Sequence, residues 1–227
     1  SHDFRTPLAA IVAAADELLA EDVAWSPAAI ADFAGVIRGE AARLNQLVTN
    51  LLDLTRIEAG VLQPQRGWYD VAEIIYSVLQ RLAPRLHERA LELAIPDDLP
   101  LLPIDYVQIE QVLWNVLENG LKYSPHGSPV LVAVQPEPAA LCIRVGDRGP
   151  GIAQAERARV FTKFYRLPQP GTDRIAGMGI GLAICKGFIE AHGGQIALLE
   201  RAQGGTLVEI RLPRELPGAL VKQEAML

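Results

Sequence analysis

A histidine followed directly by a carboxylate stands at the start of the chain, as His2 and Asp3. A neutral imidazole attacks through one ring nitrogen, and a carboxylate that accepts the proton of the other nitrogen fixes the tautomer and raises the nucleophilicity. Thr6 follows one helical turn later, which predicts its hydroxyl on the same side of a helix. The pair predicts a histidine nucleophile, although a simply solvated His-Asp pair has the same sequence.

Two amides and an ammonium group share one face of a second predicted helix. Asn115, Asn119 and Lys122 fall at i, i+4 and i+7, opposite the apolar face of that helix. An amide oxygen is a hard ligand that suits Mg²⁺, and lysine binds phosphate as a point charge. The stripe therefore predicts a site for a metal-bound polyphosphate, while a polar face exposed to solvent remains the alternative.

A carboxylate and two glycines follow a predicted strand. Asp147 stands at the strand end, and Gly149 and Gly151 come directly after it. Glycine allows the backbone to approach a flat ligand closely, and the carboxylate can accept from an exocyclic amine such as that of adenine. A glycine turn with a surface aspartate is the other interpretation of this segment.

Three glycines, Gly177, Gly179 and Gly181, open a predicted helix over residues 179–191. Backbone of this kind at a helix N-terminus predicts an anion site. The spacing is GxGxG rather than GxGxxG and no strand directly precedes it, which excludes a dinucleotide fingerprint. Residues 166–176, polar with Pro and Gly, predict a mobile lid. Phe161 and Phe164 precede the lid, and they suit either a core position or a lid anchor.

The first segment that must position these residues is a helical hairpin. Apolar residues at helical spacing predict a helix that includes residues 8–19, and Ser26-Pro27 predicts the start of a second helix after a connection around residues 21–27. In that second helix an apolar residue recurs every seven positions, at Ile30, Ile37, Leu44 and Leu51, with companions at Phe33, Ala34, Ala41, Val48 and Leu54. Such a seam predicts a dimeric four-helix bundle, although packing on the rest of the chain would also cover it.

The remainder of the chain has a mixed α/β pattern after a linker. The sequence predicts helices over 71–86 and after Asp105, and strands over 91–95, 130–134, 141–145, 195–200 and 206–212. Pro84 predicts an end or a kink in the first of these helices. The tail from residue 215 is expected to be loosely ordered.

Composition excludes several classes of protein. The 227 residues are 50% hydrophobic and 21% charged, which suits one large domain or two modest ones. The net charge is −6 with no basic run, so no nucleic-acid partner is expected. Cys142 and Cys185 stand apart in apolar surroundings, which favours buried reduced thiols. No apolar run approaches the length of a membrane span, so no membrane contact by this part of the chain is expected.

Taken in order, the motifs resemble those of the sensor histidine kinases of two-component systems over nearly the whole chain. Residues 2–8 resemble their H-box, 115–123 the N-box, 147–151 the first glycine box, 160–165 the F-box and 177–181 the second glycine box. His192-Gly193-Gly194 and Gly204-Gly205-Thr206 match late positions. The phrases DRGPGI and GLAICKGFIEAHGG resemble the potassium-transport (Kdp-type) subfamily. Gly120 departs from the alanine usual in the N-box, at a cost of up to ~1 kcal/mol of helix stability.

The resemblance implies an α-helical hairpin, dimeric as a four-helix bundle, followed by an α/β sandwich of the gyrase and histidine-kinase ATPase type. It implies boundaries at 1–59 for the hairpin, 60–69 for a linker, 70–214 for the ATP-binding domain and 215–227 for a tail. The implied cofactors are ATP and Mg²⁺, with Asn119 as the metal ligand. The residues implied to bind them are Asn115, Asn119, Lys122, Tyr123, Asp147, Gly149, Gly151, Phe164, Gly177, Gly179, Gly181 and Leu182.

The resemblance also implies the reaction and the partners. His2 takes the phosphoryl group with Asp3 as the general base, and the group then passes to an aspartate of a response-regulator receiver domain. Asp3 and Thr6 match the family's phosphatase signature, which predicts dephosphorylation of that partner as well. The chain is interpreted as the cytoplasmic piece of a longer protein anchored in a bacterial inner membrane, and as a homodimer through residues 1–59.

Two other functions are compatible with parts of this pattern. An ATPase of the same fold that drives a conformational clamp would need a carboxylate to activate water, and Glu118 is the candidate beside the amide stripe. Its helix position points it away from Asn115 and Asn119. A scaffold that only dimerises would have lost nucleotide binding, and the intact motifs argue against that.

Overall fold

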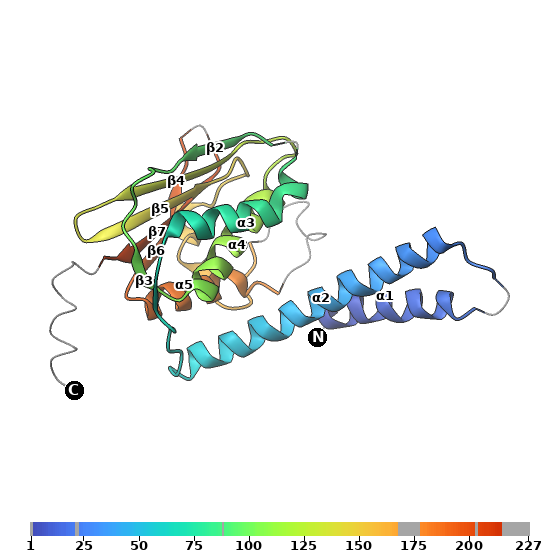
Figure 1. Ribbon diagram of the computed structural model, residues 1–227. Helices are drawn as coiled ribbons and strands as arrows, with labels where there is room; N and C mark the ends of the chain where they lie inside the picture. The colour runs from blue at the N-terminus through green and yellow to red at the C-terminus, as the bar shows by residue number, and fades with distance from the viewer. Residues whose placement is uncertain (1, 21–22, 88, 168–177, 203, 215–227) are drawn as a thin grey trace.

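The computed structural model describes residues 2–20, 23–87, 89–167, 178–202 and 204–214. Two helices lead the chain, α1 (His2–Leu18) and α2 (Pro27–Glu58). They form an antiparallel hairpin in which the N-terminal end of α1 lies beside the middle of the longer α2 (Figure 1). Ser26 caps α2 by accepting from the backbone N–H of Ala29 at 3.2 Å, as its sequence predicts. The predicted helical hairpin is therefore present.

An α/β domain follows the hairpin, and its five-stranded sheet has the order β2-β4-β5-β7-β6. Strand β2 is parallel to β4, and the other neighbours are antiparallel. The strands are β2 (Leu91–Ala94), β4 (Val130–Pro136), β5 (Ala140–Gly146), β6 (Gln195–Glu200) and β7 (Thr206–Pro213). This mixed sheet confirms the predicted fold class.

Three helices cover one face of this sheet (Figure 1): α3 (Val71–Leu86), α4 (Tyr106–Tyr123) and α5 (Gly181–Ala191). The core lies between the helices and the sheet, where α4 buries Ile109, Val112, Leu113, Val116 and Leu117. Because these residues recur at helical spacing, the opposite face of α4 is left for polar side chains. Two short 3₁₀ helices, Gln154–Glu156 and Arg159–Phe161, lie between β5 and α5.

A small second sheet was not predicted. Strand β1 (Gly67–Tyr69) pairs antiparallel with β3 (Leu102–Ile104), so a strand lies at the end of the range assigned to a linker. Three-residue strands are too short for a period-2 pattern to identify them. Helix α3 also continues through Pro84 and ends two residues later at Leu86, so the helix ends shortly after the proline, as predicted.

The two cysteines are free and buried, as predicted, at Cys142 and Cys185. Burial raises the pKa of the Cys185 thiol to about 12, which keeps it protonated and unreactive. Within the described ranges, no helix combines the length and the apolar character that crossing a membrane requires.

Candidate active site

A cavity of about 730 Å³ lies among α4, the Asp147 loop, the start of α5 and one face of α2. Its volume is in the range of small-molecule sites. Nine of the predicted residues line it: Asn115, Asn119, Lys122, Tyr123, Asp147, Gly151, Gly179, Gly181 and Leu182. The structure thus brings together three segments that are far apart in the sequence.

Asp147 is held at the end of β5 by backbone donors. Its Oδ1 accepts from the N–H of Gly149 at 2.7 Å and from the N–H of Thr206 at 3.2 Å. Burial raises the pKa of this carboxyl, while those two hydrogen bonds and the charge of Arg201 act in the opposite direction. Gly149 does not line the cavity but serves as one of these donors. The carboxylate is therefore fixed in orientation before any ligand binds.

The turn before β7 passes directly behind Asp147. Gly205 has φ +101°, and a Cβ at this position would collide with the backbone carbonyl of Asp147. Only glycine fits both the conformation and the space. Arg201 completes this support, because its Nη1 donates to the Asp147 carbonyl at 3.1 Å. Sequence reasoning found Gly205 and Thr206 only as late motif positions and missed Arg201.

The amide stripe of α4 faces the cavity and fits a nucleotide with its metal ion. The Nδ2 of Asn115 is buried and has no hydrogen-bond partner in the described part of the chain. An unsatisfied buried amide is costly, so a ligand group that accepts from it would be favoured at this place in the cavity lining. Gly181, at the N-terminus of α5, approaches this amide closely, so free backbone N–H groups open next to it. These donors suit phosphate oxygens.

A divalent ion at this place would depend on amide and phosphate oxygens. Among the described residues, no three His, Cys, Asp or Glu side chains gather as a metal site. Mg²⁺ is commonly bound by few protein ligands together with substrate phosphates and water. The amide of Asn119 suits that role.

Several basic side chains, among them Arg43, Lys122 and Arg166, line the cavity. Burial lowers the pKa of Lys122, and the nearby charges of Arg166, Arg43 and Arg85 lower it further, whereas Glu118 raises it. The three arginine charges disfavour the charged form of the lysine, which indicates a positive potential around it. A bound polyanion would reduce the repulsion among these cations. Glu118 also lines the cavity, and its Oε1 forms an ion pair with Arg85 Nη1 at 2.8 Å. A carboxylate held in an ion pair is a weaker base for activating water, which does not favour the clamp ATPase.

The second glycine segment differs from its prediction. Gly179 has φ +69°, a left-handed conformation that a helix does not contain, and α5 begins at Gly181 rather than at 179. Gly177 and most of the predicted lid lie outside the described residues.

The structure does not bring Phe164 to the cavity. Its side chain is 59% exposed, its φ is +63°, and it is absent from the cavity lining. Phe161 instead packs partly buried against the core. Phe161 therefore has the core role that was considered. The lid-anchor role of Phe164 stays a prediction, because most of the lid lies outside the described residues.

Helix α1 carries the predicted nucleophile. His2 and Asp3 lie in its first turn and Thr6 one turn later, with an exposed side chain. No described residue of α1 lines the cavity, and the hairpin side of the lining comes from α2.

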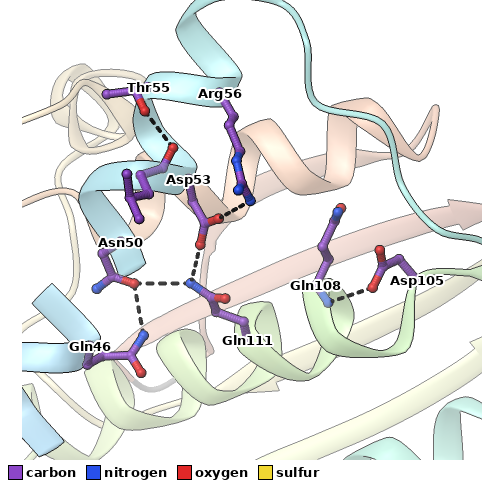
Figure 2. Close-up of polar contacts among 9 residues, drawn as sticks. Gln46, Asn50, Asp53, Thr55, Arg56, Asp105, Gln108 and Gln111 are labelled. Carbon is purple, nitrogen blue, oxygen red and sulfur yellow. Dashed lines mark hydrogen bonds and ion pairs between the residues drawn. The ribbon is translucent and has the colours of Figure 1, made fainter. Parts of the chain in front are cut away.

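A polar network fastens α2 to α4 (Figure 2). The Nε2 of Gln111 donates to Asn50 Oδ1 at 3.1 Å and to Asp53 Oδ2 at 3.3 Å. Burial raises the pKa of Asp53, and the Gln111 hydrogen bond and Arg56 oppose that change. Leu54, predicted in the seam of the bundle, is instead buried in the core of the α/β domain. The hairpin thus docks on the α/β domain beside the cavity.

His192 is a buried structural histidine rather than a ligand of the cavity. Its Nε2 accepts from the N–H of Asp105 at 2.9 Å, and its Nδ1 lies 2.7 Å from the Phe188 carbonyl, so the hydrogen is on Nδ1. Asp105 in turn caps α4 and accepts from the N–H of Gln65. Burial lowers the pKa of His192, and Arg66 contributes in the same direction.

This neutral histidine predicts a pH dependence of stability. Because the folded-state pKa lies below the unfolded value of about 6.5, the unfolded chain binds more protons below that pH. The stabilisation is present above pH ~6.5 and is lost as the pH falls, by at most about 1.4 kcal/mol per pH unit. Urea unfolding between pH 7 and 5 should show this slope in the wild type and a shallower slope in His192→Gln. The exposed control His87→Gln should show the same slope as the wild type. Equal slopes in all three proteins would contradict the assignment.

Comparison with known proteins relates both parts of the chain to one group. Residues 1–60 match the His Kinase A (phospho-acceptor) domain, and residues 104–216 match the histidine kinase-, DNA gyrase B- and HSP90-like ATPase. The solved mycobacterial sensor histidine kinase MprB is 32% identical, with a TM-score of 0.58, over 66% of this chain and 99% of that one.

Curated relatives are similar over nearly the whole chain. The sensor protein KdpD of Escherichia coli is 34% identical over 95% of this chain, and the sensor histidine kinase WalK of Bacillus subtilis is 35% identical over 94% of it. The matched region is 24% of that KdpD and 35% of that WalK. The chain therefore spans a quarter to a third of the length of these relatives.

Proposed function

The chain belongs to the sensor histidine kinases, and on that premise we propose that it is a catalytic core that autophosphorylates His2 from ATP and passes the phosphoryl group to an aspartate of a response regulator. The observation that carries this proposal is the cavity in which Asp147, the amide stripe and the start of α5 meet. It adjoins the hairpin that begins at His2. No other described cavity of the chain combines these groups.

Each side of the cavity has a role in the proposal. Asp147 accepts from the adenine amine, because its carboxylate is already oriented by backbone donors. Asn119 binds Mg²⁺, and Asn115 and Lys122 contact the phosphates. Gly179 and Gly181 support the lid segment and offer backbone N–H groups at the helix N-terminus. Positioning and charge neutralisation supply most of the catalysis of phosphoryl transfer.

The transfer step uses the hairpin residues. A ring nitrogen of His2 forms the new bond to the γ-phosphorus while the bond between that phosphorus and the bridging oxygen of ADP breaks. Asp3 accepts the hydrogen on the other ring nitrogen and so holds the imidazole in the attacking tautomer. The phosphohistidine then donates its phosphoryl group to the carboxylate of the partner.

Exposed apolar side chains support the proposed homodimer. Ile30, Val48 and Leu51 of the predicted seam are each more than 40% exposed, as are Leu8 and Val12 of α1. A second hairpin would bury this surface in a four-helix bundle.

The family does not by itself set the subfamily or the location of the whole protein. Identity to KdpD supports a Kdp-type kinase, while WalK is equally similar. We propose, from the family resemblance, that the full-length protein is anchored in a bacterial inner membrane.

Incubation with γ-labelled ATP and Mg²⁺ tests the function. The protein should acquire label that is acid-labile and alkali-stable, as expected of a phosphoramidate, and should pass it to a receiver domain. Stable binding of ATP without any label in a dimeric sample would refute the kinase assignment.

We expect Thr6→Ala to lose phosphatase activity selectively. In the proposed reaction the Thr6 hydroxyl, exposed one turn after Asp3, orients a water for attack on the phosphorylated receiver. Loss of one positioning hydrogen bond predicts a decrease of about 10-fold or more. Dephosphorylation of a labelled receiver would be timed beside autophosphorylation, with Thr55→Ala, exposed on α2 and outside the cavity lining, as a matched control. Unchanged dephosphorylation would remove Thr6 from the mechanism.

A further inference from the structure

We propose that Arg43 of α2 is a further phosphate-binding residue, which contacts the γ-phosphate of the bound nucleotide from the hairpin side of the cavity. The inference rests on the proposed function, because it assigns a residue to the same site. Neither the predicted motifs nor the nucleotide-binding domain contains Arg43.

The face of α2 that meets the α/β domain carries Arg43. Arg43, Leu47 and Asn50 follow one another at helical spacing and all line the cavity. The same face continues to Asp53, which binds Gln111 of α4. The docked helix is therefore a wall of the nucleotide cavity, and Arg43 is the basic residue of that wall.

Ile57 and Glu58 hold this wall in place near the end of α2. Ile57 packs on Gly187 of α5, where a Cβ would lie 2.6 Å from its Cδ1, so a glycine is what allows the close approach. Glu58 forms an ion pair with Lys163 in the segment between β5 and α5. These two contacts fix the end of α2 against α5 and the segment before it, and so help to hold the helix that carries Arg43.

Arg43 also lies at the level of His2 along the hairpin. Each residue is 16 positions from the end of its helix at the connecting loop, His2 from Leu18 and Arg43 from Pro27. At 1.5 Å per residue both lie about 24 Å from that loop. Figure 1 shows the start of α1 beside the middle of α2. The γ-phosphate of ATP is the one transferred to His2, so it must come closer than the other phosphates to this position along the hairpin.

The charge and geometry of Arg43 suit a terminal phosphate. Its ion pair in the described structure is with Glu40 one turn away, at 3.5 Å and with a 39% exposed arginine side chain, which is a weak surface interaction. The guanidinium has five donors and binds phosphate in a bidentate manner. Arg43 and Lys122 both line the cavity, and the charge of Arg43 contributes to the lowered pKa of Lys122, which indicates that the two cations lie near each other.

Nucleotide titration of Arg43→Ala tests the proposal, with Arg38→Ala as the matched control. Arg38 is exposed on the same helix and does not line the cavity. We expect ATP with Mg²⁺ to bind Arg43→Ala roughly 10-fold more weakly, whereas ADP affinity changes less than about 2-fold. Arg43→Lys should restore part of the difference, and Arg38→Ala should resemble the wild type.

Ile57→Lys provides an independent measurement, because this change in the hairpin disrupts the contact of α2 with Gly187 of α5. In that background Arg43→Ala should no longer alter the ratio of ATP to ADP affinity. Equal weakening of ATP and ADP by Arg43→Ala, or no weakening of either, would overturn the inference. If the inference fails in this way but the wild type still acquires label from γ-labelled ATP, the proposed function stands. A wild type that binds no ATP would refute both.

Discussion

Replacement of His2 by glutamine is expected to abolish incorporation of label from γ-labelled ATP while leaving ATP affinity within about 2-fold of the wild type. Glutamine keeps a polar side chain on α1 but offers an amide nitrogen, which is not a nucleophile at neutral pH. The cavity lining contains no described residue of α1, so nucleotide binding has no reason to change. Loss of label with unchanged ATP affinity would show that His2 accepts the phosphoryl group and does not take part in nucleotide binding.

The matched control is His87→Gln, since His87 is exposed at the end of α3 and far from the hairpin in sequence. That variant should be labelled at the wild-type rate. Residual acid-labile label in His2→Gln would identify another acceptor histidine, with His126 as the remaining surface candidate, and would reject His2. A tandem measurement of bound ATP on the same samples excludes loss of folding as the cause.

Helical spacing explains why much of the site was predictable. On α4 the apolar residues occupy one face, so Asn115, Asn119 and Lys122 had to share the other face whatever the rest of the chain did. Asp147, Gly149 and Gly151 follow a strand, and the end of that strand is marked by the end of its alternating pattern of side chains. For such residues local periodicity determines direction, and the structure only had to bring the segments together.

Contacts between distant segments left no local signal. Arg201 and Gly205 support Asp147 from more than fifty residues away, and neither stands in a pattern that names its partner. Leu54 continues the heptad repeat of α2, yet it is buried against the α/β domain. A heptad repeat reports that a helix face is apolar and not which surface covers it. Docking of the hairpin therefore required the structure.

The same distinction separates the two aromatic residues of the 160–165 motif. Phe161 and Phe164 are three residues apart, a spacing that predicts a shared helix face. The chain forms only a short 3₁₀ helix ending at Phe161, and Phe164 has a left-handed φ of 63°. Periodicity cannot be applied where regular structure ends, which is why one ring is packed and the other exposed.

Asp147→Asn is expected to weaken ATP binding roughly 10- to 100-fold, which is the value of a hydrogen bond to a charged group. The backbone N–H groups of Gly149 and Thr206 both point at Oδ1, so the amide oxygen of asparagine must take that position. Its NH₂ group then occupies the place of Oδ2. A donor would face the adenine amine, which is itself a donor, and two donors cannot pair.

The same orientation predicts a change of base preference that loss of folding would not produce. Inosine triphosphate presents a carbonyl in place of the adenine amine, so it should bind Asp147→Asn at least as tightly as ATP does, whereas the wild type should prefer ATP. Competition titrations with both nucleotides measure the ratio directly. The exposed Asp97→Asn is the control and should keep the wild-type preference. If Asp147→Asn also preferred ATP by the wild-type factor, the adenine would have to be recognised by another group, and the orientation of the nucleotide in the cavity would need to be reversed.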